Sequence, residues 1–366
     1  MSVEQRIEPE WRIPDGAGRD LGIGIVGCGG IVRYAHLPAY REAGLRVLVV
    51  HDVDTDRARA VAEEFGIPAV ASSVEEVATT PGVAIVDVAV PPWEQPAIVD
   101  RVAALGRHLL CQKPLALEYP TAVTEVGAVE RAGVLLAVNQ QMRWTPGVAA
   151  TRSLVRQGAI GRPREARIQV DVATPWHMWP WLASAPRLEV MFHSIHYLDA
   201  LRSLLGDPVW VTSIHGRDPV RPRVEGETRT TTVLEYADGL QAQVIVSHDN
   251  DHGTPAAHLV VRGETGAIEG TIGLLYDYPT GRIDTLSLLR EGALVDEYEF
   301  DRRWIPDAFL GPMGDLMDAI ATGREPITSG RDNLGTVAVA LAAYRSAEER
   351  RSVRLDEVRG AAHGPG

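Results

Sequence analysis

Cysteine is scarce in this chain, and its two cysteines, Cys28 and Cys111, form neither a metal-type pair nor a disulfide framework. Two small buried thiols are typical of a reducing compartment, so a cytoplasmic location is expected. Long apolar runs are also lacking, because stretches such as VAIVDVAV are far shorter than the roughly 20 residues of a membrane span. The polar, acidic residues 1–19 lack the features of a signal peptide and are expected to form a flexible leader.

Positive charge is in short supply as well. The formal net charge is −13, and the chain has no long run of lysine or arginine. Nucleic acids and anionic membranes bind clustered cations, so neither is expected as a main partner. Apolar residues make up 45% and charged residues 23% of the 366 residues, which is ordinary for a globular protein. At roughly 150 residues per domain, this length predicts two domains.

From Leu21 onward, short apolar runs alternate with segments of helical periodicity. Strands are expected at 21–27, 46–52, 84–90, 108–114 and 134–140, and helices at 34–44, 54–66, 95–106 and 121–133. This alternation is typical of βαβ units and a parallel sheet. The right-handed crossover rule then favours a doubly wound Rossmann sheet, an α/β architecture, over residues 20–142.

The pattern changes after about Met142. A helix is expected at 145–161, followed by strand-like runs at 164–173, 208–217, 229–249, 258–276 and 285–292 and by helices at 303–323 and 333–350. The segments YADG and RGETG contain residues that favour turns between strands. Residues 143–366 are therefore predicted to form an α/β domain whose sheet is mostly antiparallel.

The segment GIVGCGGIV joins the first expected strand to the first helix. Gly27 allows a tight turn, and Gly29, followed by the small Gly30, lets the backbone approach a pyrophosphate at a helix N-terminus. The third glycine of the G-x-G-x-x-G pattern falls at Val32, which is a departure that could loosen the contact between helix and strand. With a strand before it and a helix after it, the segment predicts a dinucleotide site.

An acid stands at the end of the second expected strand. Asp52 fits the carboxylate that holds the ribose 2′-hydroxyl of a dinucleotide, and it would disfavour a 2′-phosphate. NAD is therefore expected rather than NADP. The alternative is that Asp52 only caps the next helix, although Asp54 fits that role at least as well.

Several segments together resemble the glucose–fructose oxidoreductase / inositol dehydrogenase (Gfo/Idh/MocA) family. They are the glycine segment, AVPPWEQPA, HLLCQKPLAL, HSIHYLD, FLGPMGDLMDAIATGREPITSG and AAYRSAEE, and the likeness runs from about Gly22 to Leu355. The resemblance implies a nicotinamide-binding Rossmann domain, a second α/β domain with a large open sheet, and homodimers or homotetramers formed through that sheet. It also implies an NAD(P)-dependent dehydrogenase that acts on a secondary hydroxyl of a sugar, cyclitol or glycoside. The cofactor-binding residues would be Gly27, Gly29, Gly30, Ile31, Asp52, Pro92 and Lys113.

The resemblance places the chemistry on Lys113 and His196. In the family the lysine contacts the nicotinamide ribose and the substrate hydroxyl, with Pro114 fixing the turn, and the histidine relays the proton. Three positions depart from the family pattern: Gln112 replaces a glutamate, Phe192 an aspartate and Pro96 a histidine. His193 or Glu189 could compensate for Phe192, so His193 is also a catalytic candidate.

Other side chains are candidates for substrate binding. TPWHMWPWL holds three tryptophans, and aromatic faces suit the apolar faces of sugar rings, so Trp176, His177 and Trp179 are candidates. The same tryptophans could instead pad a loop against the core. Asp199 and Arg143 complete the substrate set, whereas SHDNDH at 247–252 is expected to be a solvated loop.

Other functions remain open for this sequence. A bound NAD could drive epimerisation, elimination or glycoside cleavage through transient oxidation of the sugar, with no net redox change, or the chain could be a sensor that binds NAD and a sugar. Glu189, His193 and His196 fall on one face of an amphipathic helix at 100° per residue, which would suit zinc or manganese. No metal is expected, because hydride transfer in this family needs none.

Overall fold

A computed structural model describes residues 18–219, 223–277 and 281–360. All but the last two residues of the predicted leader lie outside this part of the chain. Contacts divide the chain into two compact units. The N-terminal unit comprises the described residues up to Gln141 together with Ile305–Val337, and the C-terminal unit comprises Met142–Trp304 and the described residues from Ala338 onward.

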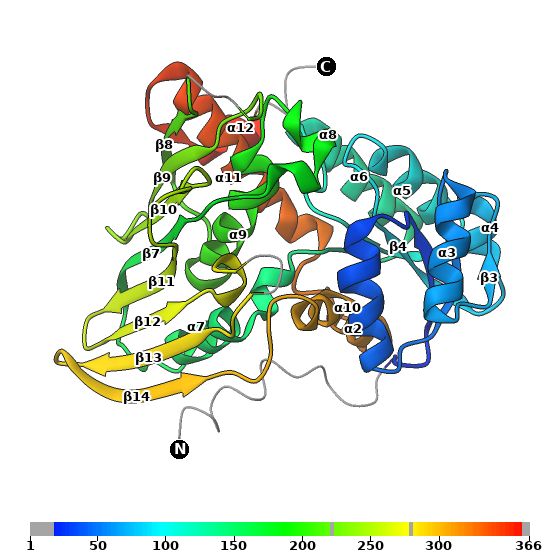
Figure 1. Cartoon of the computed structure of the whole chain (residues 1–366), viewed down its shortest axis with the longest axis horizontal. Helices are drawn as coiled ribbons and strands as arrows, with labels where there is room; N and C mark the ends of the chain where they lie inside the picture. Colours follow the sequence, from blue (N-terminus) through cyan, green and yellow to red (C-terminus); the bar gives the residue numbers. More distant parts are fainter. Residues whose placement is uncertain (1–17, 220–222, 278–280, 361–366) are drawn as a thin grey trace. The chain divides into compact units, whose positions relative to one another are not determined.

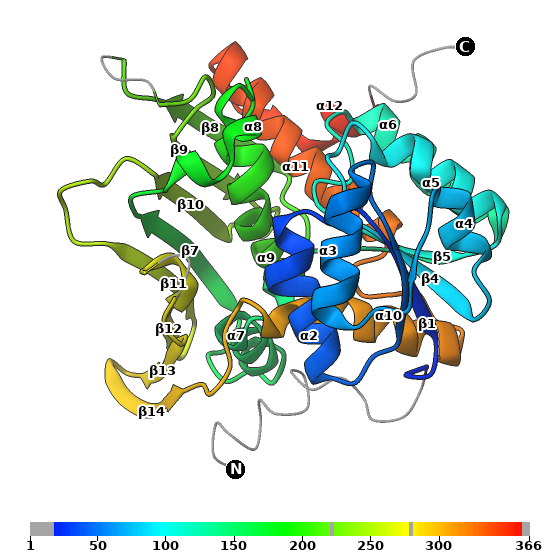
Figure 2. The same ribbon diagram turned by 45° about the vertical axis from the view of Figure 1, so that its right-hand side comes forward.

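The N-terminal unit is built on a six-stranded sheet in the order β3-β2-β1-β4-β5-β6, in which every pair of neighbours is parallel. This order is that of the Rossmann fold, so the predicted doubly wound sheet is confirmed. Figure 2 shows β1, β4 and β5 beside one another, with the helices α2 and α3 to their left in this view. The strands are β1 (Gly22–Val26), β2 (Val47–His51), β3 (Ala69–Val70), β4 (Val83–Val88), β5 (His108–Cys111) and β6 (Leu136–Val138).

Local signals explain where the helices of this unit begin and end. Asp54 caps α3 by accepting the backbone N–H of Arg57, and Gly66 ends this helix in the left-handed conformation. Ser73 caps α4 in the same way through the N–H of Glu76. The helices are η1 (Val32–His36, a π-helix), α2 (Leu37–Glu42), α3 (Thr55–Phe65), α4 (Val74–Thr79), α5 (Gln95–Ala104), α6 (Tyr119–Ala132), η6 (Asp307–Phe309) and α10 (Leu310–Thr322).

The C-terminal unit contains a nine-stranded sheet in the order β14-β13-β12-β11-β7-β10-β9-β8-β15. All neighbours are antiparallel except β7 and β10, so the predicted, mostly antiparallel sheet is confirmed. Figure 1 shows these strands in the same order, from β8 down to β14. They are β7 (Pro163–Asp171), β8 (Trp210–Gly216), β9 (Arg229–Glu235), β10 (Gln241–Ser247), β11 (Ala256–Gly263), β12 (Ala267–Thr271), β13 (Thr285–Arg290), β14 (Ala293–Glu299) and β15 (Val353–Arg354).

Helices cover one face of this sheet. Along β9 and β10, buried residues alternate with more exposed ones, as in a sheet that has one face on the core. The helix α9 packs on β7 and β10, and α7 packs on β12 and β13. The helices and turns are η2 (Gln141–Trp144), α7 (Pro146–Arg156), η3 (Trp176–Met178), α8 (Pro180–Ala183), η4 (Val190–Ser194, a π-helix), α9 (Ile195–Leu205), η5 (Gly273–Leu275) and α12 (Leu355–Gly360). The helix α11 (Gly330–Glu349) has residues in both units.

The contacts group Ile305–Val337, which includes α10, with the N-terminal unit, whereas the sequence-based division assigns all of 143–366 to the second domain. Because compact units need not coincide with functional domains, that division stays a prediction. Among the described residues, none of the helices combines the length and the apolar character needed to cross a membrane.

Candidate functional site

The glycine turn after β1 has the geometry of a phosphate cradle. Gly27 has a φ of 98°, and a Cβ on it would lie 2.4 Å from the carbonyl oxygen of Ala89, so only glycine fits. A Cβ on Gly29, in contrast, would have no neighbour within 4 Å. The backbone at Gly29 is therefore open to a close approach by a ligand, and the turn fits the dinucleotide that the sequence predicts.

The position of the missing third glycine has its own local structure. Val32 is fully buried, and it begins the wide π-turn η1 rather than an ordinary α-helical turn. Gly30 is exposed, and Ile31, the residue before the π-turn, is half-buried. The segment therefore accommodates a valine side chain where the dinucleotide pattern has glycine.

Asp52 is tied to this turn by hydrogen bonds. Its Oδ2 accepts the backbone N–H of Cys28 at 2.7 Å, and its Oδ1 accepts that of Asp54 at 2.8 Å. Asp54, not Asp52, caps the helix α3, so the capping interpretation of Asp52 is wrong. Each carboxylate oxygen has two lone pairs, and Asp52 can therefore accept a ribose hydroxyl as well.

The strand order places the turn where a Rossmann sheet binds its ligand. Strand β1 lies between β2 and β4, so the connections diverge at the carboxyl end of β1. The turn residue Pro92 is buried beyond the carboxyl end of the neighbouring strand β4. The cofactor candidates of the N-terminal unit thus follow the ends of neighbouring strands.

Lys113 follows β5 in a turn whose Lys113–Pro114 peptide is cis. The side chain is half-buried, and burial lowers its pKa to about 7. Lys113 is also the only lysine of the 366-residue chain, which otherwise uses arginine for its cationic side chains. Arginine stays protonated, whereas a buried lysine can lose its proton, so this position holds the one side-chain amine that can act as a base. This count is a signal in the sequence that the motif-based prediction did not use.

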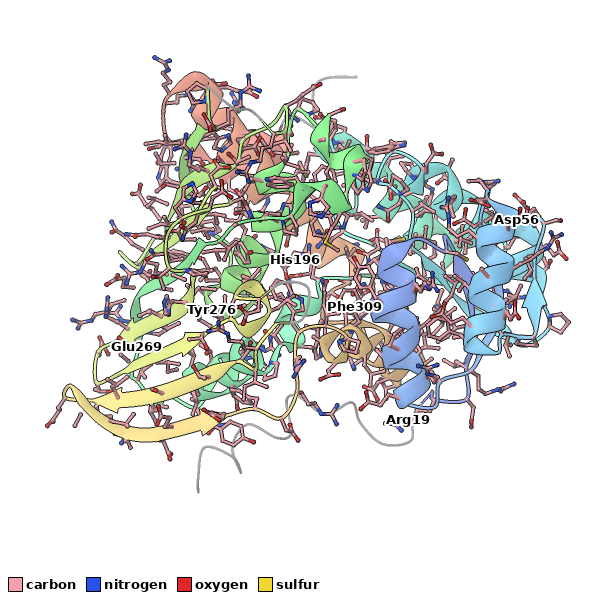
Figure 3. The ribbon with its side chains drawn as sticks, in the orientation of Figure 1. Arg19, Asp56, His196, Glu269, Tyr276 and Phe309 are labelled. Carbon is pink, nitrogen blue, oxygen red and sulfur yellow. The ribbon has the colours of Figure 1, made fainter. Side chains whose placement is uncertain are left out.

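His193 and His196 lie at the start of the helical segment that contains α9. His193 belongs to the π-helix η4 and is half-buried, whereas His196, labelled in Figure 3, is buried with its ring edge on Trp304 at 5.5 Å. The π-turn has a wider repeat than an α-helix. The 100° periodicity used to place Glu189, His193 and His196 on one face therefore does not apply here.

Glu189 is fully buried and already engaged. Its two oxygens accept the hydroxyls of Ser194 and Thr230, each at 2.5 Å. Within the described ranges, no three histidine, cysteine, aspartate or glutamate side chains are grouped as a metal site would require.

Another histidine, His248, lies beside His193. His248 is 1% exposed, and its ring is 4.8 Å from that of His193 and 5.3 Å from that of Trp176. Its Nδ1 lies 2.6 Å from Thr174 Oγ1, and its Nε2 lies 3.6 Å from Glu189 Oε1. The prediction that 247–252 is a solvated loop is therefore wrong at His248. Its place directly after a strand was the signal available in the sequence.

The aromatic stretch contributes unequally. Trp176 is buried and meets His193 edge-on at 5.4 Å, whereas His177 is exposed and Trp179 half-buried. Phe192 is buried too, and the ring of Trp181 meets it edge-on at 5.4 Å. Phe192 thus leaves no acid at this position of η4.

Arg143 and Asp199 bind each other. The guanidinium donates Nε to Asp199 Oδ2 at 2.7 Å and Nη2 to Oδ1 at 2.6 Å, and both side chains are buried. This bidentate pair joins η2 to α9 within the C-terminal unit. It accounts for the burial of two charged residues without a ligand.

Comparison with known proteins identifies the family. A model of the oxidoreductase family with an NAD-binding Rossmann fold matches residues 21–140, and a model of the GFO/IDH/MocA C-terminal domain matches residues 148–269. The chain belongs to the GFO/IDH/MocA family. The predicted family, fold class and enzyme class, an NAD(P)-dependent dehydrogenase, are thereby confirmed, as is binding of NAD(P).

Individual relatives extend over most of the chain. A D-apiose dehydrogenase from Paraburkholderia graminis is 31% identical over 348 residues, which cover 90% of this chain and 88% of the relative. A myo-inositol 2-dehydrogenase from Thermotoga maritima is 25% identical, with 93% and 100% covered. An Agrobacterium radiobacter oxidoreductase, solved with NAD+, L-tartaric acid and magnesium, superposes with a TM-score of 0.82 at 26% identity, with 92% of this chain and 99% of that chain covered.

Proposed function

We propose that the protein oxidises a secondary hydroxyl of a sugar, cyclitol or glycoside with NAD. The observation that carries the proposal is Lys113: a lone lysine among arginines, half-buried after β5, with its pKa lowered to about 7. An amine with this pKa can exist in either protonation state near neutral pH, as a group that exchanges a proton with a substrate hydroxyl must.

Each of the proposed site residues has a separate role in the oxidation of the alcohol. Bound nicotinamide supplies the hydride acceptor. Lys113 stabilises the developing alkoxide and exchanges its proton, and His196 relays the proton away, with His193 as a second candidate for this relay. Lys113 also holds the cofactor, together with Gly27, Gly29, Gly30, Ile31, Asp52 and Pro92.

The substrate is proposed to contact the aromatic and polar side chains that the sequence predicts. Trp176, beside His193 and His248, offers an aromatic face to a sugar ring, and His177 and Trp179 lie next to it in the chain. For the other two candidates, Arg143 and Asp199, we propose an indirect role, in which their mutual salt bridge holds α9, the helix that carries His196. The relatives named for apiose and inositol support this substrate class.

The carboxylate of Asp52 supports NAD over NADP. Held by two backbone N–H groups, it would meet a 2′-phosphate as a like charge. The outward face of the C-terminal sheet is proposed to form a homodimer or homotetramer. A cytoplasmic location is proposed from the two buried free thiols, Cys28 and Cys111.

The test is a screen of sugars, inositols and glycosides with NAD and NADP, in which NADH or NADPH formation is followed by absorbance. Steady formation of NADH with one compound supports the proposal, and a preference for NADP overturns its cofactor part. If none of the compounds reduces either cofactor, the dehydrogenase proposal fails.

A second function is favoured by Phe192. This buried phenyl ring stands where the family pattern has an acid that helps hold the substrate beside the general base, so the substrate would be held differently here. Transient oxidation with retained NAD, leading to epimerisation, elimination or glycoside cleavage, is the alternative. Protein that keeps NAD through purification and converts a glycoside without added cofactor would support it.

A further inference from the structure

A buried polar cluster lies around the turn that carries Lys113. It consists of His36, Tyr40, Asp87, Gln112 and Asn139, hereafter the His36 network, and all five side chains are buried. They come from η1, α2, β4, the end of β5 and the end of β6. Nothing in the proposed chemistry of Lys113 and His196 uses these residues.

The hydrogen bonds fix the direction of the Gln112 amide. The backbone N–H of Lys113 donates to Gln112 Oε1 at 3.1 Å, and the Nε2 of the same amide lies 2.7 Å from His36 Nε2. An amide nitrogen only donates, so His36 Nε2 must accept and carries no proton. Asn139 Nδ2 lies 3.1 Å from the same ring nitrogen and is a second donor to it.

The other ring nitrogen then carries the proton of a neutral histidine. His36 Nδ1 donates to Asp87 Oδ2 at 2.7 Å, and the Tyr40 hydroxyl donates to the same oxygen at 2.8 Å. Burial and the nearby Asp87 raise the pKa of Tyr40 well above its usual range, so Tyr40 stays a donor. The ring of Phe309, labelled in Figure 3, packs 5.1 Å from the imidazole and completes its burial.

The turn itself is held from two sides. Gln112 accepts the N–H of Lys113, and Gln95 Nε2 donates to the carbonyl oxygen of Pro114 at 2.9 Å. Gln95 is fully buried at the start of α5. Two neutral amides therefore clamp the Lys113–Pro114 turn.

We propose that Gln112 is a positioning residue, which couples Lys113 to a neutral His36 and keeps a carboxylate away from this position beside the lysine. The proposal rests on the proposed role of Lys113. A glutamate here would accept the Lys113 N–H equally well. Its second oxygen, however, would face the bare Nε2 of His36, so a proton would have to be added between them.

The surrounding titratable groups leave this neutral arrangement intact. His36 and Tyr40 face Gln112 from the first helical segment, and Asp87 faces it from β4, where its Oδ2 holds both of them. Cys111 precedes Gln112 on β5, and burial raises its pKa well above the usual value. The charge of Glu125 in α6 also contributes to the raised pKa of Cys111. Burial raises the pKa of Glu125 itself to about 8.

The closing experiment uses the fact that the chain has one lysine. Protein grown with 13C,15N-labelled lysine gives a single lysine side-chain signal, so the pKa of Lys113 can be titrated directly by NMR in the full-length protein. Gln112→Glu is expected to raise this pKa by up to about one unit, because a carboxylate bonded to the Lys113 N–H favours the ammonium form and the proton added at His36 offsets only part of its charge. The 15N spectrum of the histidine rings in the variant should gain one doubly protonated ring.

Two further variants separate charge from position. Gln112→Met removes the clamp without adding charge, so the lysine pKa should stay near the wild-type value while kcat falls about ten- to hundredfold. Gln157→Glu, the same chemical change at the end of α7 in the C-terminal unit, should alter neither spectrum.

Each outcome bears on the proposal. If Gln112→Glu leaves the lysine titration and the histidine spectrum as in the wild type, the coupling does not exist. A doubly protonated His36 in the wild-type protein, which requires no variant to fold, would equally overturn it. Because neither titration needs a substrate, a failed search for alcohol oxidation would refute the proposed function, while these spectra would still decide the role of Gln112.

Discussion

Replacement of Lys113 by methionine should make the protein more stable at low pH. Lowering the lysine pKa to about 7 from its ordinary 10.5 is a shift of about 3.5 units. At about 1.4 kcal/mol per unit, the buried ammonium lowers the free energy of unfolding by about 5 kcal/mol at most. Methionine has a similar length and carries no charge, so Lys113→Met removes this penalty.

The sign of the pH dependence follows from proton binding in the two states. Below pH 7 both states carry the proton, and the native state bears the full penalty. Between pH 7 and 10.5 the native lysine has lost its proton while the unfolded chain still binds one, so wild-type stability rises with pH. The gain in the free energy of unfolding of Lys113→Met over the wild type should therefore be largest below pH 7 and vanish by about pH 10.5.

Urea unfolding of both proteins at several pH values between about 6 and 10 measures this difference. Arg59→Met is a matched control, because Arg59 is an exposed cation on α3 that pairs with the exposed Asp56. The difference in the free energy of unfolding between Arg59→Met and the wild type should stay nearly constant over this pH range. If the Lys113→Met difference is also constant, the lysine does not have a lowered pKa and the reasoning is refuted.

Three other substitutions test separate parts of the account. Asp52→Asn should lower kcat/KM for NAD about tenfold and reduce the preference for NAD over NADP, as measured by initial rates with each cofactor. An unchanged ratio of kcat/KM for NAD to kcat/KM for NADP would contradict the role of Asp52. Gly29→Ala should raise the Kd for NAD about tenfold or more in a calorimetric titration, with little change in Tm, because the added Cβ would occupy only the space assigned to the ligand. Equal affinity for NAD in the wild type and the variant would refute the phosphate-binding role of this turn. Asp199→Asn should cost about 3–5 kcal/mol in urea unfolding, because it leaves the buried Arg143 guanidinium uncompensated; a loss below about 1 kcal/mol would show that the pair is not structural.

Much of the fold could be predicted because its signals are local. The apolar run before Gly27 and the alternation that follows it define the parallel sheet. Caps mark the helix boundaries, and Ser73 with Glu76 three residues later would also have predicted the helix α4, which the periodicity missed. Strands β3 and β15, with two residues each, are too short for a periodic signal.

The arrangement of the candidate site was harder to predict. The π-turn at Val190–Ser194 changes the angular repeat in the segment where α-helical periodicity had placed His193, and the residue types do not indicate such a turn. The burial of Glu189 depends on Thr230, and that of His248 on Thr174, which are contacts between segments far apart in the chain. The His36 network is likewise non-local, since it joins a helix start to the ends of strands β5 and β6.

The central claim is that Lys113 and His196 carry proton transfer during the oxidation of a hydroxyl by NAD. It is tested most directly by the initial rate of NADH formation from the substrate found in the screen, measured side by side for the wild type, Lys113→Ala and His196→Ala. Each variant is predicted to lose about 10²–10⁴-fold in kcat, the contribution expected of a positioned acid or base. Full activity in both variants would contradict the claim.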